Sequence, residues 1–444
     1  MTKETNKNQS QNAGSAKIDK IAIFNRDDPS RSVVIAGGFI EFRYWESILQ
    51  DSIKASYSFV DSGNSIDKKT VAEGLPLQGS EQFLFEATDN NDTKLKLDMM
   101  TKKSISIDEQ TGKSILMLPL VSPSHPLNDS QNVRKRYDGK ISDHAKAIIK
   151  DFLQREGVDK KLDIEETSNT ISEFGYSRTP YYMLNNFAKK AVPNGGQGRT
   201  AGYFFFETSD KFIFKSIDSM FDKEKNEPKR SIIYNESSDR EKEIPAGYDY
   251  KALTYDKEGG DVMEMAKMGA FQTAQITFDP YDFTFKRNIL SNLENLTGSQ
   301  NSIKPLSSSG KDLVSFNPTL VKEFGRTTIS FFDTGTFSKE VEKSSQVNFD
   351  ISEIMNQSIM RYNQVFASKV HITIQGDFSL HAGDMIFFDA PSPQSDTKND
   401  KVDKQTGGLY IIASLCHYIK PDRTLTKLCL IRDSSGRKGN HTKR

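Results

Sequence analysis

Short stretches in which apolar and polar residues alternate dominate the first part of the chain. In IKASYSFVDSG the alternation is unbroken from Ile53 to Phe59, and similar short runs with polar turns between them recur over residues 17–121. A period of two places successive side chains on opposite faces of a β-strand. Many short strands joined by polar turns are typical of a β-sandwich or a β-barrel, so the sequence predicts one of these two architectures here.

Helical periodicity begins after Tyr137. Apolar residues in SDHAKAIIKDFLQREGV recur at three- and four-residue spacing, which predicts an amphipathic helix. A second helix is predicted over 179–191, with Thr179 as its N-cap and Pro180 at the first helical position. The stretch YFFFETSDKFIFKSI that follows predicts a β-hairpin, and its run of three phenylalanines favours a strand buried on both faces.

The segment GDFSLHAGD near the C-terminus has the pattern G-D-x-x-L-x-x-G-D, and a strand is predicted on either side of it. Glycine permits tight bends and aspartate favours turns, so the pattern predicts two successive turns between two strands. Bent strands of this kind are what a small curved or closed sheet requires. The structural residues of this turn pattern are Gly376, Asp377, Leu380, Gly383 and Asp384.

Little in the sequence indicates catalysis. The chain has no nucleophile elbow, no P-loop and no dinucleotide fingerprint, and its histidines and cysteines fit no standard zinc spacing. Its two cysteines, Cys416 and Cys429, are predicted to be buried free thiols. We therefore predict no catalytic, cofactor-binding or metal-binding residues, no cofactor, and a protein that is not an enzyme.

The charge of the chain narrows the class of partners. Lys and Arg together number 60, as do Asp and Glu, so the formal net charge is zero. A protein that binds nucleic acid through a generally basic surface is thereby disfavoured, and the basic run NVRKRYDGK is more simply explained as a solvated linker. Because no window approaches about 20 apolar residues, we expect no membrane insertion.

Five stretches in collinear order carry a resemblance to a known family. They resemble the central baseplate hub protein of T-even-like contractile-tailed bacteriophages, in particular the branch that infects marine bacteria, including the cyanophages. The resemblance extends from about residue 17 to 436. The stretches are GGFIEFRYWESILQDSIKASYSFVDSG, VRKRYDGKISDH, TAGYFFFETSDKFIFKSIDSMF, SKVHITIQGDFSLHAGDMIFFDA and GGLYIIASLCHYIKPDRTLTKLCLIRDS.

The resemblance implies an α+β, mainly β fold with two tube-type β-barrel domains, an inserted α+β domain and connecting helices. No internal repeat between the two barrels is evident in the sequence. The implied division is a disordered N-terminal arm over 1–15, a first tube-type domain over 16–135 completed by 222–260, an inserted domain over 136–221, a second tube-type domain over 262–436 with a helix at 350–368, and a flexible basic tail over 437–444.

The same resemblance implies a structural role in the virion, after assembly in the host cytoplasm. Family members form a homotrimeric ring that joins the sixfold tail tube to the threefold cell-puncturing spike. The implied partners are the spike or needle protein and the tail tube or tube-initiator protein, with the tape measure protein as a further candidate. DNA would only pass through the central channel. A chain without net charge suits such a conduit, because a basic lumen would retain the phosphates.

Two alternatives remain open at this point. A tail-associated cell-wall hydrolase would need a cleft with paired carboxylates or a zinc site. The hub or spike component of a bacterial contractile injection system would share the fold and differ in its genomic context. The loop at 391–407 and the C-terminal tail could contact partners, although solvent-exposed connections explain both more simply.

Overall fold

The structure is a computed structural model of the whole chain. The description below covers residues 14–25, 28, 30–62, 68–75, 77–110, 113–154, 160–194, 201–222, 227–234, 244–259, 261–270, 272–279, 283–291, 304–305, 326–331, 351–390 and 406–435.

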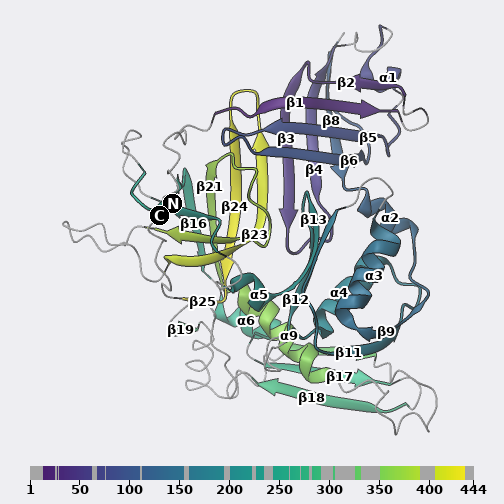
Figure 1. The fold of residues 1–444 in the computed structure, drawn as a ribbon, viewed down its shortest axis with the longest axis vertical. Helices are drawn as coiled ribbons and strands as arrows, with labels where there is room; N and C mark the ends of the chain where they lie inside the picture. Colours follow the sequence, from purple (N-terminus) through teal and green to yellow (C-terminus); the bar gives the residue numbers. More distant parts are fainter. Residues whose placement is uncertain are drawn as a thin grey trace, which may run out of the picture.

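Eight N-terminal strands form one half of a large, mainly antiparallel sheet, as the alternating pattern predicts (Figure 1). Short helices α1 (Val71–Gly74) and α2 (Ser124–Ser130) follow β4 and β8. The strands are β1 (Lys17–Phe24), β2 (Ser32–Val34), β3 (Phe39–Ser47), β4 (Lys54–Asp61), β5 (Gln82–Thr88), β6 (Lys94–Thr101), β7 (Ile105–Gln110) and β8 (Lys113–Val121).

Seven later strands form the other half of the same sheet. Its long central strand β23 pairs antiparallel with β24 on one side and with β3 on the other, so the N-terminal and C-terminal halves are hydrogen-bonded to each other. The strands are β14 (Arg230–Ile233), β15 (Tyr250–Lys251), β16 (Thr254–Gly259), β21 (Ser368–Gln375), β22 (Met385–Asp389), β23 (Gly408–Ile419) and β24 (Thr424–Arg432).

A continuous apolar core lies against one face of this sheet. It contains Phe42 and Phe85, whose rings stack with centroids 3.9 Å apart, together with Ile372 and Leu415 from the C-terminal half. The core therefore crosses the boundary between the two halves. Burial of large aromatic rings, each of which removes roughly 150–250 Å² from water, stabilises this junction.

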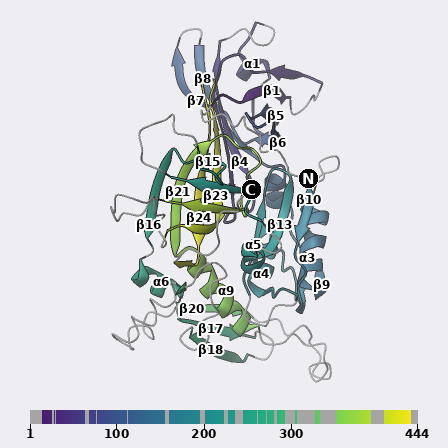
Figure 2. The ribbon, with the colours of Figure 1, turned by 60° about the vertical axis from the view of Figure 1, so that its left-hand side comes forward.

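The part of the chain that lies between the two halves in sequence forms an α+β unit beside the sheet (Figures 1 and 2), which we call the inserted unit. Its own core packs α3 and α4 against the β12–β13 hairpin. Helix α4 begins at Pro180 after the N-cap Thr179, as predicted. The elements are β9 (Arg136–Lys140), α3 (Ile141–Ile148), a π-helical turn (Ile149–Leu153), β10 (Lys161–Ile164), β11 (Thr170–Phe174), α4 (Pro180–Lys190), β12 (Tyr203–Glu207), β13 (Lys211–Ser216) and α5 (Ile217–Phe221).

Helix α9 (Ser352–Val365) lies between this unit and a second, smaller sheet at one end of the molecule (Figure 1). The small sheet has the strand order β18–β17–β20. One face of it packs on α9. The remaining elements are α6 (Val262–Met268), β17 (Gln272–Phe278), β18 (Phe285–Ser291), β20 (Arg326–Phe331) and the short pair β19 (Lys304–Pro305) and β25 (Ser434–Ser435).

Several predictions can be compared directly with these elements. The mainly β class, the helix after Thr179 and the hairpin after Gly202 are confirmed, and all five residues of β12 are buried. The predicted helix at 350–368 corresponds to α9. Within the described residues no sheet closes on itself, so two separate barrels remain a prediction.

The strands of residues 222–260 pair with the C-terminal half of the sheet. β14 is parallel to β22 and β16 is antiparallel to β21. The family resemblance implied that this segment completes the first tube-type domain, and the domain bounds as a whole remain a prediction. Residues 1–13 of the predicted arm over 1–15, most of the 391–407 loop and the tail over 437–444 lie outside the described residues.

Candidate functional site

The predicted turn pattern lies between β21 and β22, where three parts of the chain meet. Close packing explains both glycines. A Cβ atom at Gly376 would lie 2.5 Å from Thr424 Cγ2, and one at Gly383 would lie 2.7 Å from Phe206 Cζ. Gly383 also has φ of +85°, in the left-handed region that side chains disfavour. Larger residues would therefore separate this segment from the strands that it touches.

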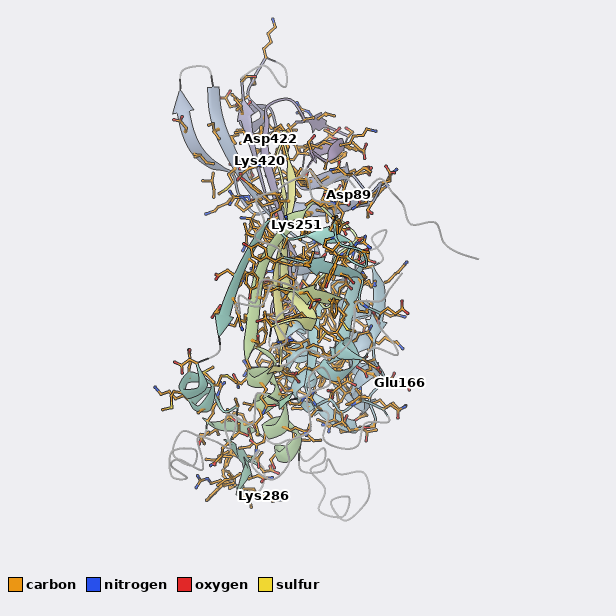
Figure 3. The ribbon with its side chains drawn as sticks, turned by 90° about the vertical axis from the view of Figure 1, so that its left-hand side faces the viewer. Asp89, Glu166, Lys251, Lys286, Lys420 and Asp422 are labelled. Carbon is orange, nitrogen blue, oxygen red and sulfur yellow. The ribbon has the colours of Figure 1, made fainter. Side chains whose placement is uncertain are left out.

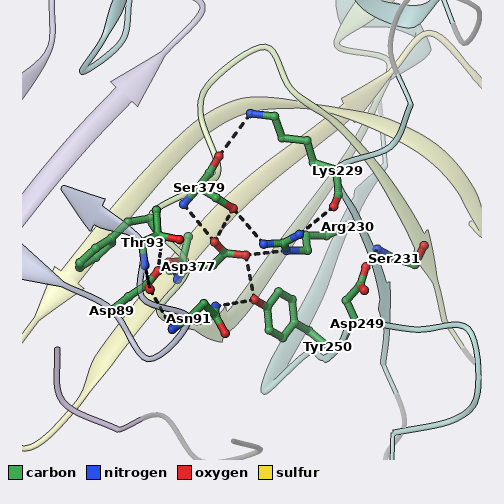
Figure 4. A network of polar contacts seen from close by, with 12 residues as sticks. Asp89, Asn91, Thr93, Lys229, Arg230, Ser231, Asp249, Tyr250, Asp377 and Ser379 are labelled. Atoms are coloured by element: carbon green, nitrogen blue, oxygen red, sulfur yellow. Dashed lines mark hydrogen bonds and ion pairs between the residues drawn. The ribbon is translucent and has the colours of Figure 1, made fainter. Parts of the chain in front are cut away.

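Asp377 is the centre of a buried polar network (Figure 4). Its carboxylate accepts hydrogen bonds from Arg230 Nε at 2.7 Å and from the Tyr250 hydroxyl at 2.8 Å. Ser379 donates to it from both its backbone N and its hydroxyl, at 3.0 Å and 2.5 Å. Asp377 is 0% exposed, and these hydrogen bonds and the ion pair offset the free-energy cost of burying its charge.

The electrostatics of this carboxylate follow from the same neighbours. Burial by itself would raise the pKa of Asp377, but the guanidinium of Arg230 and the hydrogen bonds from Ser379 and Tyr250 hold that pKa below its ordinary value. The pKa of Arg230 is raised, since the attraction of Asp377 exceeds the effect of burial. Both groups are therefore charged at neutral pH, and the contact is an ion pair.

This network reaches the N-terminal half through the turn between β5 and β6. Asn91 donates its side-chain amide to the Tyr250 hydroxyl at 2.8 Å. The backbone N of Phe378 donates to Asp89 Oδ2 at 2.7 Å. These are contacts between residues more than 150 positions apart, so they fix how the two halves of the sheet meet.

Glu46 on β3 forms a second junction with the turn segment. It is 1% exposed and accepts hydrogen bonds from the Tyr44 hydroxyl at 2.6 Å and the Ala382 backbone N at 2.9 Å. His381 Nδ1 lies 3.1 Å from its Oε1, and Ser209 N of the β12–β13 hairpin donates to the same oxygen at 3.0 Å. One carboxylate thus ties together the N-terminal strands, the inserted unit and the C-terminal turn.

Burial and charge oppose each other at this second junction. Burial by itself would raise the pKa of Glu46, yet His381 together with the hydrogen bonds from Tyr44 and Ala382 lowers it to about 2. Burial by itself would lower the pKa of His381, but Glu46 raises it above the ordinary value. Protein donors reach both carboxylate oxygens of Glu46, and the residue is buried.

Glu207 on β12 forms the third junction. Its carboxylate accepts hydrogen bonds from the hydroxyls of Ser122 and Ser124 at 2.6 Å and 2.8 Å, and Lys160 Nζ lies 2.8 Å away. Ser122 and Ser124 directly follow β8. The inserted unit is thereby attached to the end of the N-terminal strands through a fully buried charge.

The five residues of the predicted turn pattern have different roles. Gly376 and Gly383 permit close packing, Asp377 holds Arg230, and Leu380 lies in the large core. Asp384 accepts a hydrogen bond from the backbone N of its neighbour His381 at 2.7 Å and pairs with Lys229, also at 2.7 Å. Burial raises the pKa of Asp384 despite Lys229.

The sequence did not single out Arg230, Tyr250, Glu46 or Glu207. Each is one of many charged or aromatic residues in the chain, and each partner is distant in sequence. The only usable signal is the alternation in β3, which places Glu46 on the same strand face as Phe42 and Tyr44 and so predicts a buried carboxylate.

Outside the apolar cluster that buries Ile411 and Ile431, the described residues on the other face of the large sheet are largely polar and carry both signs of charge. Arg43 lies opposite Tyr418 in the register of β3 and β23, and Lys427 approaches the same ring. Glu41 accepts a hydrogen bond from the Tyr418 hydroxyl at 2.9 Å and pairs with Arg43, also at 2.9 Å. We call this surface, on β16, β21, β24, β23, β3 and β4, the polar sheet face.

Metal binding and membrane insertion are the other functions to consider. Within the residues that the structure describes, no group of three or more metal-ligating side chains is assembled. Over the same residues, no helix has the length and apolar character that spanning a bilayer demands. Cys416 and Cys429 are free and half-buried, not fully buried as predicted, and both belong to the polar sheet face.

Comparisons with known proteins give a structural likeness and no sequence relative. No family model and no curated protein matches the chain. The tail protein from Neisseria meningitidis MC58 is similar with a TM-score of 0.51 and 9% identity, over 93% of this chain and 96% of that one. The tail protein of prophage MuSo2 from Shewanella oneidensis gives a TM-score of 0.49 and 8% identity over 94% and 98% of the two chains.

A type VI secretion component from Escherichia coli, described as structurally similar to bacteriophage T4 tail proteins, gives a TM-score of 0.43 with 9% identity over 90% and 76% of the two chains. The likeness to the Neisseria protein extends over nearly the whole of both chains. This chain therefore has a fold similar to that of the Neisseria tail protein, and its buried junctions hold three parts of the chain together.

Proposed function

We propose that the protein is a structural component of a contractile-tail baseplate, and specifically its central hub. The observation that supports this most strongly is the likeness to a tail protein over 93% of the chain. The finer assignment, to hub proteins of T-even-like phages of marine bacteria, rests on the sequence resemblance alone. The division into two tube-type domains and an inserted domain belongs to the same proposal.

In this proposal three copies form a ring that joins the tail tube to the spike. A ring with threefold symmetry needs a heterologous contact that repeats between neighbours. The polar sheet face is the surface best suited to line the central channel, because cations and carboxylates lie side by side on it, with Arg43 and Lys427 near Glu41 and Asp256. A lining in which Arg43, Lys54, Lys369 and Lys427 are interspersed with carboxylates would hold phosphates less tightly than a wholly basic lining.

The buried junctions suit a part that transmits force between tube and spike. Glu46, Asp377 and Glu207 each connect segments that are far apart in sequence, and each is enclosed by protein donors. Breaking a buried ion pair costs about 3–5 kcal/mol, so the three parts are expected to move as one body. Because protein donors enclose these three carboxylates, we do not propose catalysis at them.

Electron microscopy of the purified chain in negative stain tests the proposal. Threefold rings with an open centre are expected. A second assay measures the turbidity of a peptidoglycan suspension, which the hub should leave unchanged. Monomers that clear the suspension would contradict the hub and favour the cell-wall hydrolase. The hub of a bacterial contractile injection system would also form rings. A gene that lies outside a phage genome would distinguish it from a phage hub.

A further inference from the structure

The small sheet of β17, β18 and β20 packs its polar face inward. Thr273 and Gln275 on β17 are 0% exposed and Thr277 is 5% exposed, all on the side covered by α9. Sheets that pack on a helix normally bury their apolar face. The orientation of this sheet is therefore inverted, and we refer to it as the inverted sheet.

Hydrogen bonds hold the inverted sheet in this orientation. Gln275 donates to Ser330 Oγ at 2.6 Å and accepts a hydrogen bond from Thr328. Asn288 on β18 donates to Ser352 Oγ of α9 at 3.1 Å. Satisfied buried polar groups specify one arrangement, since any other packing would leave them without partners.

The opposite face of the inverted sheet is apolar and exposed. Phe285, Ile329 and Phe331 are 74%, 75% and 77% exposed, and Ile289 is 49% exposed. In the strand register Phe278 lies between Phe285 and Phe331, so the aromatic rings form one row across the three strands. We call these five residues the outer apolar face. A contiguous apolar surface of this kind marks an interaction site.

Charge indicates what covers the outer apolar face. The three strands carry Lys286, Arg287 and Arg326 and no carboxylate in their described residues. Arg287 lies opposite Ile276 and hence on the apolar side. Packing two copies of this face against each other would bring arginines together, which costs free energy. The complementary surface is therefore apolar and acidic.

The chain itself has such a surface beside α6. A groove of about 350 Å³ is lined by Glu258, Asp261 and Glu264, with Met268 at 45% exposure among them. Lys369, whose Nζ lies 3.0 Å from Glu258, is the one cation among the lining residues that the structure describes. Methionine side chains adapt readily to an incoming aromatic ring. We call this the acidic groove.

We propose that the outer apolar face of one copy docks on the acidic groove of a second copy. This inference rests on the proposed ring, because a contact between two different surfaces is the heterologous kind that a closed ring requires. The inverted sheet lies at the end of the long axis opposite Lys420 and Asp422, as the position of Lys286 in Figure 3 shows. The contact would thus lie far from the turn between β23 and β24.

Charge-reversal variants of the full chain test the contact, with sedimentation velocity as the measure of association between copies. Arg287→Glu and Glu264→Lys are each expected to raise the dissociation constant between copies by about tenfold or more, since like charges then face each other. The double variant is expected to return to within about threefold of the wild type. Lys150→Glu, at an exposed site on the inserted unit, is the matched control and should leave association unchanged.

The melting temperature of each variant separates a folding defect from a contact defect. Phe331→Ser gives a second measurement, because its side chain is exposed and its loss should weaken association without unfolding the chain. Unchanged association in both single charge variants, or additive weakening in the double variant, would overturn the contact. The contact would also be overturned if the wild type did not self-associate but bound phosphatidylglycerol vesicles, with binding lost in Arg287→Glu. That result would assign the outer apolar face to a membrane.

The two proposals fail in different ways. If wild type and all variants form the same threefold rings, the hub proposal stands and the contact is wrong. If association depends on Arg287 and Glu264 but electron microscopy shows no closed ring, the contact stands and the ring is wrong.

Discussion

The large sheet and the inverted sheet use the same alternating pattern in opposite ways. The large sheet buries Phe42 and Phe85 in a stacked pair and exposes Arg43. The inverted sheet buries Gln275 and exposes Phe331. The alternating sequence therefore determines that the two faces of a sheet differ in polarity, but the elements packed against the sheet determine which face is covered. In the large sheet the cover is the rest of the chain, and in the inverted sheet we infer that it is a second copy.

The largest expected contrast comes from removing one phenyl ring from each sheet. Phe85→Ala should lower the free energy of unfolding by about 3–5 kcal/mol, because it leaves a cavity in a closely packed core. In the dissociated chain, Phe331→Ala should change it by less than about 0.5 kcal/mol, because its ring is 77% exposed there. Urea denaturation measures both. Equal losses would mean that the two faces are covered alike within one chain.

Removing the Asp377 carboxylate tests the junction that both halves of the large sheet share. Asp377→Ala leaves Arg230 without its buried partner and should cost about 3 kcal/mol or more. Asp422→Ala is the control, because Asp422 is exposed at the β23–β24 turn, and its loss should cost less than about 0.5 kcal/mol. A similar small loss in both variants would show that Asp377 does not hold the junction.

The Glu46–His381 pair predicts a pH dependence of stability. The pKa of Glu46 is lowered to about 2, so its contribution is complete above about pH 4.5 and is lost as the pH falls toward 2. The pKa of His381 is raised, so its contribution is complete below about pH 6.5 and is lost as the pH rises through the raised value. Stability from this pair is therefore greatest between those limits.

Glu46→Gln should reduce the loss of stability both toward low pH and toward high pH. Lowering the pKa of the Glu46 carboxyl from its ordinary value to about 2 corresponds to about 3 kcal/mol, most of which the variant would lose near pH 5.5. Thermal unfolding between pH 3 and 8 is the measurement, with Asp422→Asn as the exposed control. A profile identical to that of the wild type would show that Glu46 and His381 do not form an ion pair in the folded chain.

A smaller effect is expected inside the inverted sheet. Gln275→Leu leaves the hydroxyls of Thr328 and Ser330 without their partner and should cost about 1–3 kcal/mol. Gln272→Leu, on the same strand with a half-buried side chain, is the matched control and should cost much less. If Gln275→Leu stabilised the chain instead, the polar layer under α9 would not be what fixes the inversion.

The sequence predicts the local structure well where local rules decide it. Thr179 and Pro180 define the start of α4, the alternation from Ile53 defines β4, and the two Gly-Asp pairs define the turns before β22. These features depend on capping, pleat and turn chemistry, which act over a few residues.

The remaining features depend on partners that lie far away in the sequence. Nothing local tells that Asp377 meets Arg230, 147 positions earlier, or that β23 pairs with β3. Nothing in the pattern QTAQITF indicates that its two threonines and Gln275 face inward. The resemblance predicted the tail-protein fold, but the residues that connect its parts become visible only in three dimensions.

The most direct test of the account is a cryo-electron microscopy map of the assembled chain. The account predicts three copies around an open channel, with the polar sheet face lining the channel and the outer apolar face covered by the acidic groove of the neighbouring copy. A ring with Arg43 and Tyr418 on its outer surface would contradict the proposed channel lining. Monomers under all conditions, with the outer apolar face uncovered, would contradict the account as a whole.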